Sequence, residues 1–337
     1  MPLQRIREVM DEEGISNLVL TDESNIAYAL GQKASGYLFI TDEDVEIIAS
    51  KFYQYSIDGV ETAFAGSRTE FEELLEEKME GLEDVSADSL SGGLKEYDVD
   101  ETDVMSVARE VKTEEEIKKI REACKITTEN IENLRKNLFS GLTEWGAVSE
   151  LTDFYAERGV GSSFVTNEGY DLVHRNCLSP HRDPKDDLIR EGDLVIVDTG
   201  CRKDLYCSDV TRTYCKNPSE KQKRLFNDVK NIQASIIEMM EPGVKISELA
   251  QKMDDLVDQK GYDVEKNVLH LLGHSVGVEV HENPSLHSES EKELKENMVL
   301  AIEPAIYVED IGGVRIEDTV LVKEDGCEKL SDPQNKL

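Results

Sequence analysis

The sequence lacks three features that define particular classes of protein: closely paired cysteines, a basic stripe and a long hydrophobic run. Its six cysteines contain no CxxC pair, and a chain of 337 residues needs no disulfide framework, so we expect reduced thiols. Residues 1–14 contain no apolar core of a signal peptide, and no apolar run approaches the length of a membrane span. We therefore expect a cytoplasmic protein that does not bind membranes.

Positive charge is also scarce. The chain has 72 acidic and 38 basic residues, a formal net charge of −34. Such a surface repels nucleic acid and anionic membrane, whose binders must supply clustered lysine and arginine. Because the acidic residues are spread along the whole chain, a solvated surface suited to a halophilic cytoplasm explains them better than an acidic docking face. The hydrophobic fraction of 39% argues against disorder.

The hydrophobic pattern divides the chain into two unequal domains, residues 1–112 and 113–337. The first domain is predicted to be α/β, with an opening helix that turns Ile6, Val9 and Met10 inward. Its other expected elements are strands at 17–21, 36–41 and 45–49, an acidic helix at 70–80 and a loop-rich segment at 86–103.

A long helix is predicted to open the second domain. Thr113 and Glu116 form a capping box, and apolar residues follow at helical spacing until the chain reaches Gly141. A second helix is expected at 143–158, ending at Gly159.

The same helix pattern returns 102 residues later. Ser219 and Gln222 form the second capping box, and the second helix of this pair is expected at 247–260. The offset also relates Gly141 to Gly243 and Gly159 to Gly261. It predicts an internal duplication whose strands converge on one centre, although two unrelated helix hairpins of similar length would give the same pattern.

Carboxylates at the ends of short apolar runs distinguish the second domain. Asp198 follows the run 194–197, and Glu303 follows 299–302. Burying such carboxylates is costly unless a cation pairs with them. Four carboxylates and one imidazole suit a pair of hard or borderline divalent metals. The five candidate ligands are Asp198, Asp209, His274, Glu303 and Glu317.

Three further histidines accompany these candidates. His270 and His281 flank His274, and His181 precedes Asp198 by seventeen residues. A lone histidine is usually structural, but four near the presumed ligands suggest a site. Alternatively, His270 and His281 only form hydrogen bonds that support the metal ligands. Strand alternation also places Arg315 on the same face as Glu317.

Five ordered blocks contain the candidate ligands. They are Gly192-Asp193-Leu194-Val195-Ile196-Val197-Asp198-Thr199-Gly200, Ser208-Asp209-Val210-Thr211-Arg212-Thr213, Gly273-His274-x-x-Gly277-x-x-x-His281-Glu282, Ile302-Glu303-Pro304 and Val314-Arg315-Ile316-Glu317-Asp318. In these blocks the sequence resembles the pita-bread metallopeptidase family M24, which includes Xaa-Pro dipeptidase (prolidase), aminopeptidase P and methionine aminopeptidase.

The resemblance implies an α+β pita-bread fold, an internally duplicated and curved antiparallel sheet with helix pairs, preceded by a smaller α/β domain. It implies two divalent ions per subunit, manganese, cobalt, zinc or iron, with Asp198 and Glu317 shared or chelating and His274 on one ion only. It further implies a homodimer. The residues that it implies for substrate handling or support of the ligands are His181, His270, His281 and Arg315.

The first domain favours one branch of the family. The segment 25–31 resembles part of the creatinase/prolidase N-terminal domain, which methionine aminopeptidases usually lack. The chain also departs from the family pattern at three places. Leu271 stands where glycine is common, the stretch 166–180 contains an additional His174, and Lys51-Phe52-Tyr53 replaces a frequent Arg-Tyr pair.

These observations lead to a hypothesis of metal-assisted hydrolysis of the bond before proline in a short peptide. Two metals would activate water, with Glu303 as general base. His281 and His181 would hydrogen-bond the substrate and its oxyanion, while Arg315 orients ligands such as Asp198.

Aminopeptidase P and methionine aminopeptidase-like activities are alternatives within the family. A non-catalytic peptide-binding scaffold and a metal-free creatinase-like hydrolase are alternatives outside this chemistry. The complete set of five ligands disfavours both of these.

Overall fold

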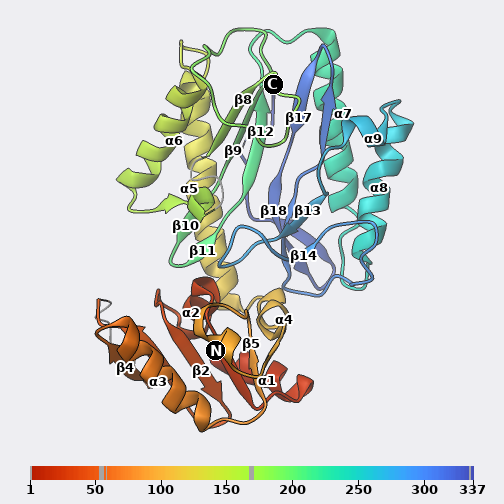
Figure 1. Cartoon of the computed structure of the whole chain (residues 1–337). Coiled ribbons are helices and arrows are strands. Elements are labelled where there is room, and N and C mark those ends of the chain that lie inside the picture. Colours follow the sequence, from red (N-terminus) through yellow and green to blue (C-terminus); the bar gives the residue numbers. More distant parts are fainter. Residues whose placement is uncertain (1, 53–56, 58, 167–170, 334) are drawn as a thin grey trace. The chain divides into compact units, whose positions relative to one another are not determined.

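A computed structural model describes residues 2–52, 57, 59–166, 171–333 and 335–337 (Figure 1). The chain divides into two compact units, residues 1–109 and 110–337. Each unit has β-sheet and a hydrophobic core of its own. Among the described residues, none of the helices combines the length and the apolar character needed to cross a membrane.

The first unit is built on one mixed sheet. Among the residues described in this unit, its strands are β1 (Asn17–Leu20), β2 (Tyr37–Thr41), β3 (Val45–Ser50), β4 (Glu61–Ala65), β5 (Val85–Ala87) and β6 (Val99–Glu101). They lie in the order β4-β3-β2-β1-β5-β6, with β1 antiparallel to β2 and parallel to β5. Its helices are α1 (Pro2–Glu13), α2 (Glu23–Leu30), α3 (Arg68–Glu80), α4 (Val104–Glu110, which ends one residue past the unit) and the 3-10 helix η1 (Gly92–Glu96).

Most elements predicted for the first unit are confirmed, and one prediction is wrong. Helix α1 buries Ile6, Val9 and Met10, and β1, β2, β3 and α3 lie where expected. The segment 86–103, predicted to be loop-rich, instead contributes β6 and most of β5 to the sheet. Strands of three residues are too short for alternation to be visible in the sequence.

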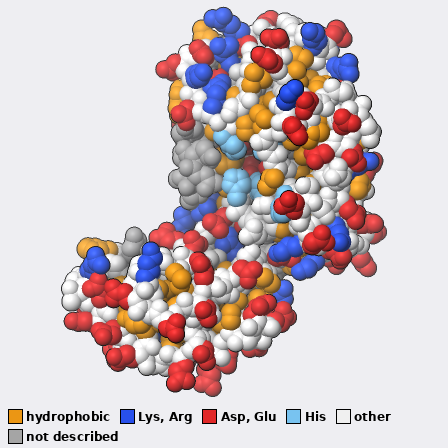
Figure 2. All heavy atoms as spheres, turned by 45° about the vertical axis from the view of Figure 1, so that its right-hand side comes forward, with side chains coloured by type: hydrophobic (Ala, Val, Ile, Leu, Met, Phe, Trp, Pro, Cys, Tyr) orange, Lys and Arg blue, Asp and Glu red, His pale blue; other side chains and the backbone are white. Residues whose placement is uncertain are grey.

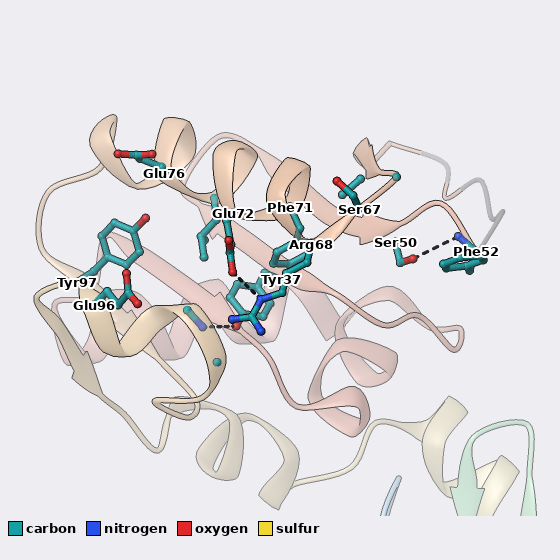
Figure 3. A pocket seen from close by; sticks show the side chains of 15 residues that line it. Tyr37, Ser50, Phe52, Ser67, Arg68, Phe71, Glu72, Glu76, Glu96 and Tyr97 are labelled. Carbon is teal, nitrogen blue, oxygen red and sulfur yellow. Dashed lines mark hydrogen bonds and ion pairs between the residues drawn. The ribbon is translucent and has the colours of Figure 1, made fainter.

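A cavity of about 940 Å³ opens beside α3 in the first unit (Figure 3). The rings of Tyr37 and Phe71 meet edge to face there, with centroids 5.1 Å apart, and Arg68 pairs with Glu72 at 2.7 Å. Phe52 lines it and is 86% exposed. Tyr53, which departs from the family pattern, lies outside the described residues.

Two helix pairs flank the strands of the second unit on opposite sides (Figure 1). They are α5 (Glu114–Asn137) with α6 (Glu144–Glu157), and α7 (Glu220–Ile237) with α8 (Ile246–Gln259). Thr113 and Ser219 cap α5 and α7 in capping boxes, as predicted. Helix α8 begins and ends 102 residues after α6, and Gly141 and Gly243 share a positive φ of 101° and 90°. The repeat predicted from the sequence is therefore present in the backbone.

In the described part of the second unit, the strands between the helix pairs form four small sheets. The strands are β7 (Gly161–Ser162), β8 (Leu172–Arg175), β9 (Val195–Thr199), β10 (Cys201–Lys203), β11 (Tyr206–Cys207), β12 (Val210–Tyr214), β13 (Gly273–Ser275), β14 (Glu282–Ser285), β15 (Val299–Ile302), β16 (Ala305–Val308), β17 (Gly312–Arg315), β18 (Asp318–Lys323) and β19 (Gly326–Lys329). Strand β9 pairs antiparallel with β8 and β12, and β15 with β13 and β18. The hydroxyl of Thr213 in β12 joins the first of these sheets to β17 through the backbone of Arg315, at 2.9 and 3.0 Å.

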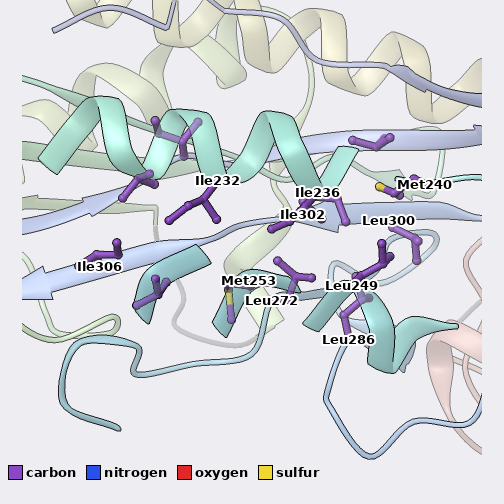
Figure 4. Packing of buried hydrophobic residues seen from close by; sticks show 14 of the residues in the cluster. Ile232, Ile236, Met240, Leu249, Met253, Leu272, Leu286, Leu300, Ile302 and Ile306 are labelled. Carbon is purple, nitrogen blue, oxygen red and sulfur yellow. The ribbon is translucent and has the colours of Figure 1, made fainter. Parts of the chain in front are cut away.

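Two apolar cores hold these strands in place. Helices α7 and α8 pack on strands of the second half through a cluster that includes Leu249 and Ile302 (Figure 4). A second cluster joins α5 and α6 to β8, β9 and β12 and includes Val197. Burial of each such side chain contributes about 1.5–3 kcal/mol. Since Val197 and Ile302 directly precede Asp198 and Glu303, the two cores determine where these carboxylates lie.

Candidate metal centre

The candidate ligands lie on or directly beside strands of the second unit. Asp198 is in β9 and His274 is in β13, while Glu303 follows β15. Asp209 lies between β11 and β12, and Glu317 between β17 and β18, so each occupies a short interruption between strands. Such interruptions redirect a side chain away from the regular alternation of a strand.

These side chains converge on one place. Ligand atoms of Asp198, Asp209 and Glu317 lie within 4.8 Å of one another, as do those of His274, Glu303 and Glu317. Glu317 belongs to both groups and therefore connects them. A third group of the same size joins Asp209, His274 and His281.

The carboxylates are electrostatically costly without a cation. Burial, followed by the charge of Glu317, raises the pKa of Asp209 well above its usual value. Burial and Asp198 raise the pKa of Glu303 to about 8, although Arg315 opposes the shift. Within the described residues, Oδ1 of Asp198 and Oδ1 of Asp209 are buried and have no hydrogen-bond partner. This oxygen-rich set with one imidazole fits divalent metal ions.

His274 presents its Nε2 to the carboxylates. Its Nδ1–H donates to the carbonyl oxygen of Ser275 at 3.1 Å, which fixes the tautomer. Nε2 lies 3.5 Å from Oδ2 of Asp209 and 3.7 Å from Oε1 of Glu303. Burial and the neighbouring His281 lower the pKa of His274 to about 3, so the ring is neutral and its lone pair is available to a metal.

Arg315 lies behind the carboxylates. Its Nη2 donates to Oδ2 of Asp198, and its Nε donates to the hydroxyl of Thr211 at 3.3 Å. The same hydroxyl donates to Oε2 of Glu317 at 2.6 Å. The contact between Arg315 and Asp198 that the sequence led us to expect is therefore present, and Thr211 extends it to Glu317.

Tyr307 connects Arg315 with His270. Nδ1 of His270 is 2.9 Å from the carbonyl oxygen of Leu271 and therefore carries the proton, so Nε2 accepts from the Tyr307 hydroxyl at 3.3 Å. The tyrosine oxygen in turn accepts from Nη1 of Arg315 at 3.2 Å. Nδ1 of His270 also lies 3.5 Å from Oε2 of Glu303. No pattern in the sequence pointed to Tyr307.

One cavity of about 50 Å³ brings the predicted residues together. The rings of His274 and His281 lie edge to face in it, with centroids 4.3 Å apart, and Phe164 and Leu172 supply apolar walls. Figure 2 shows histidine side chains at the surface of this unit, close to hydrophobic ones. The predicted residues that line the cavity are His181, Asp198, Asp209, His270, His274, His281, Glu303 and Glu317.

His174 does not line this cavity. It is buried in β8, and its Nε2 lies 2.5 Å from the carbonyl oxygen of Arg182, so it supports the loop that follows. Leu271 is half exposed beside His270. Residues 167–170 of the stretch 166–180 lie outside the described part of the chain.

Comparison with known proteins identifies the family. The model of metallopeptidase family M24 matches residues 118–324, and that of the Creatinase/Prolidase N-terminal domain matches residues 2–135. The chain belongs to metallopeptidase family M24. This M24 chain is similar to the Xaa-Pro dipeptidases of Pyrococcus horikoshii and Pyrococcus furiosus, at 30% identity to each. The alignments cover 99% of this chain and 98% and 99% of the relatives.

The crystal structure of the prolidase from Pyrococcus horikoshii matches the whole M24 chain. The TM-score is 0.89 at 29% identity, and the match covers 100% of this chain and 99% of the prolidase. The predictions of the family, of an α+β pita-bread fold with a smaller N-terminal domain, and of a metallopeptidase are confirmed. Thr211 and Tyr307 support the candidate ligands and their neighbours, and the sequence assigned neither of them a role.

Proposed function

We propose that this M24 metallopeptidase is a Xaa-Pro dipeptidase that works with two divalent ions. The observation that carries the proposal is the convergence of four carboxylates and one neutral imidazole on a buried cavity lined by three further histidines. Similarity to prolidases over nearly the whole chain supports the substrate class. The proposed ligands are Asp198, Asp209, His274, Glu303 and Glu317.

The two ions, when bound, lower the pKa of water so that a nucleophile is available near neutral pH, and they polarise the scissile carbonyl. Glu303 takes the proton of the attacking water in this proposal. Its position supports the role, because its carboxylate lies in the cavity, 3.5 Å from Nδ1 of His270 and 3.7 Å from Nε2 of His274. His281 and His181 line the cavity and donate hydrogen bonds to the substrate carbonyl as it becomes an oxyanion. Arg315 keeps Asp198 in place.

An Xaa-Pro bond poses a particular problem of recognition. The proline nitrogen carries no hydrogen, so the site must hold the substrate through its carbonyl and carboxylate groups. His181 and His281 supply ring N–H donors for these groups, and Phe164 and Leu172 supply apolar wall for the proline ring.

Further properties belong to the same proposal. The ions are manganese, cobalt, zinc or iron. Residues 1–112 are the creatinase/prolidase-like domain and residues 113–337 the catalytic domain. The protein acts in a halophilic cytoplasm, as its net charge of −34 and its unpaired cysteines indicate. It is a homodimer, as the resemblance to this branch of the family implies.

A substrate panel tests the activity. The purified chain, loaded in turn with Mn²⁺, Co²⁺, Zn²⁺ or Fe²⁺, is assayed on Ala-Pro, Ala-Pro-Ala and Met-Ala. Ala-Pro should be the best substrate. Preferred cleavage of the tripeptide would identify an aminopeptidase P, and preferred cleavage of Met-Ala a methionine aminopeptidase-like enzyme. A preparation that neither retains nor responds to any of the metals would favour the peptide-binding scaffold or the metal-free hydrolase.

Substitution of a ligand tests the centre itself. Asp209→Asn should lower Ala-Pro hydrolysis by about 100-fold or more, because several kcal/mol of transition-state stabilisation depends on the ions. The metal-free variant should be at least as stable as the parent, since a neutral amide avoids both the burial of charge and the repulsion from Glu317 that raise the pKa of Asp209. Asp204→Asn, at an exposed turn, is the matched control. Full activity of Asp209→Asn would contradict the assignment.

A further inference from the structure

A buried lysine lies directly before α5 in the second unit. The side chain of Lys112 is 1% exposed, and its Nζ donates to the hydroxyl of Ser275 at 2.8 Å and to Oε2 of Glu282 at 3.3 Å. It is also 3.4 Å from the carbonyl oxygen of Glu110. Burying an ammonium group is unfavourable unless a carboxylate and further hydrogen bonds compensate it, and here they do.

Both partners directly follow a histidine of the centre. Ser275 follows His274, and its carbonyl oxygen accepts the Nδ1–H that sets the tautomer of that ring. The Ser275 hydroxyl accepts from Lys112 and donates to the carbonyl oxygen of Val299 at 3.1 Å. The register of the pairing between β13 and β14 shifts between His274 and Ser275. Regular strand geometry alone therefore does not determine the direction of the His274 side chain.

Glu282 follows His281 and shapes the loop before it. Its Oε1 accepts from the backbone N–H of Glu279 at 3.2 Å. A Cβ at Gly277 would lie 2.4 Å from Oε2 of Glu282, so this carboxylate occupies the space beside the glycine. The loop that carries His281 therefore folds around a carboxylate whose buried cation is Lys112.

Lys112 is itself held by contacts that do not involve the centre. Its backbone N–H donates to the carbonyl oxygen of Asn297 at 3.0 Å. Two residues earlier, Glu110 pairs with Lys292 at 2.6 Å and with Lys295 at 2.8 Å. The lysine is thus a fixed point to which two separate segments are attached, as a precise site requires.

We propose that Lys112 is a positioning residue, whose ammonium group sets the spacing between His274 and His281. The inference rests on the proposed function, because it assigns His274 to the metal and His281 to the substrate. Loss of the ammonium group releases the hydroxyl of Ser275 and removes the ion pair between Lys112 and the buried Glu282 carboxylate. Both rings then move relative to the carboxylates of the centre, although no ligand has been removed.

The test compares Lys112→Met, Lys112→Arg and the double variant Lys112→Met with Glu282→Gln. Mn²⁺ affinity and stoichiometry are measured by titration calorimetry, kcat and KM are measured on Ala-Pro, and Tm is recorded for each protein. Lys112→Met should weaken the binding of one Mn²⁺ and lower kcat, each by about 10–100-fold, as loss of a supporting contact to a ligand does. Lys112→Arg, which keeps the charge and the donors, should recover part of both.

The double variant separates positioning from charge compensation. It should regain the Tm of the parent, because Glu282→Gln removes the uncompensated charge, while Mn²⁺ affinity and kcat stay low. If it regains affinity and kcat together with Tm, Lys112 only compensates a charge and the inference is overturned. If Lys112→Met alone does not fold, the double variant is still compared with the parent in Tm, Mn²⁺ affinity and kcat. Lys118→Met, an exposed lysine on α5, is the control.

Failure of the proposed function would give a different result. A parent protein that neither binds Mn²⁺ nor cleaves Ala-Pro would overturn both proposals. An active, Mn²⁺-binding parent with unchanged Lys112 variants would overturn the positioning role alone.

Discussion

The hydroxyl of Tyr307 links two side chains with different roles in the centre. It accepts from Arg315, which holds Asp198, and it donates to His270, which lies beside Glu303. The two hydrogen bonds of Tyr307 are 3.2 and 3.3 Å long, so the tyrosine aligns Arg315 and His270 more than it binds them strongly. Burial raises the pKa of Tyr307 to about 12, so the hydroxyl keeps its proton and can donate to His270.

Tyr307→Phe isolates this alignment. The ring and its edge-to-face contact with His270 are retained, so Tm should change by no more than a few degrees. Without the hydroxyl, His270 loses its donor, and kcat on Ala-Pro should fall by about 5–30-fold, the equivalent of about 1–2 kcal/mol. Mn²⁺ affinity should be nearly unchanged, because Tyr307 touches no proposed ligand directly. A large loss of Mn²⁺ affinity would show that Tyr307 acts on the ligands instead.

At the scale of elements, the first residue of α6 anchors the loop that carries His181. Glu144 is fully buried and accepts both Nη groups of Arg182, at 2.8 and 2.6 Å. It also accepts from the backbone N–H of Arg175 at 2.8 Å and of Lys185 at 2.7 Å. These four hydrogen bonds attach both ends of the segment 175–185 to one carboxylate. They hold its backbone in place, although the segment after Arg175 is neither strand nor helix.

Glu144→Gln should destabilise the fold by about 3–5 kcal/mol at pH 7, because it leaves the Arg182 guanidinium without its anion. Burial alone would raise the pKa of Glu144, but the hydrogen bonds from Arg182 and Arg175 outweigh it and the pKa is lowered. A lowered pKa stabilises the fold above the unfolded value of about 4.3, and this stabilisation is lost as the pH falls through the folded pKa.

Urea unfolding of parent and variant at several pH values tests this. The difference in stability should be largest at neutral pH and should shrink as the pH falls below about 4.3. Glu157→Gln, exposed at the other end of the same helix, is the control and should show no such dependence. A difference that grows toward low pH would contradict the role of the ionised carboxylate.

At the scale of the whole molecule, the net charge of −34 dominates. Acidic side chains are distributed widely over the face seen in Figure 2, with basic ones among them. In the whole sequence the 72 acidic residues outnumber the 38 basic ones. Repulsion between them opposes compaction, and salt screens it, since the Debye length falls from about 10 Å at 0.1 M to about 3 Å at 1 M.

Tm should therefore rise by several degrees when KCl is increased from 0.1 M to 2 M at pH 7.5, as screening reduces the repulsion. The control is the same series near pH 4.5, the calculated isoelectric point, where the net charge vanishes and the gain should be much smaller. Full stability and activity in salt-free buffer would remove the support for a halophilic source.

Elements with a local signal could be predicted from the sequence. The two capping boxes correctly predicted where α5 and α7 begin, because a capping box is a contact between neighbours in the chain. They are formed by Thr113 with Glu116 and by Ser219 with Gln222. The short strands β5 and β6 and the helix α2 were not predicted. Asp22 and Gly31 do cap α2, but eight mainly apolar residues carry little periodicity.

The sequence by itself determined the chemical types of the candidate ligands, the helix pairs and their offset of 102 residues, because each is encoded in adjacent positions. Only the tertiary structure decided how the centre is supported. Arg315 reaches Asp198 across 117 positions, Lys112 reaches Glu282 across 170, and Tyr307 meets His270 across 37. Such contacts depend on where the two apolar cores of the second unit place separate strands. No local pattern of residues specifies which distant side chains will meet.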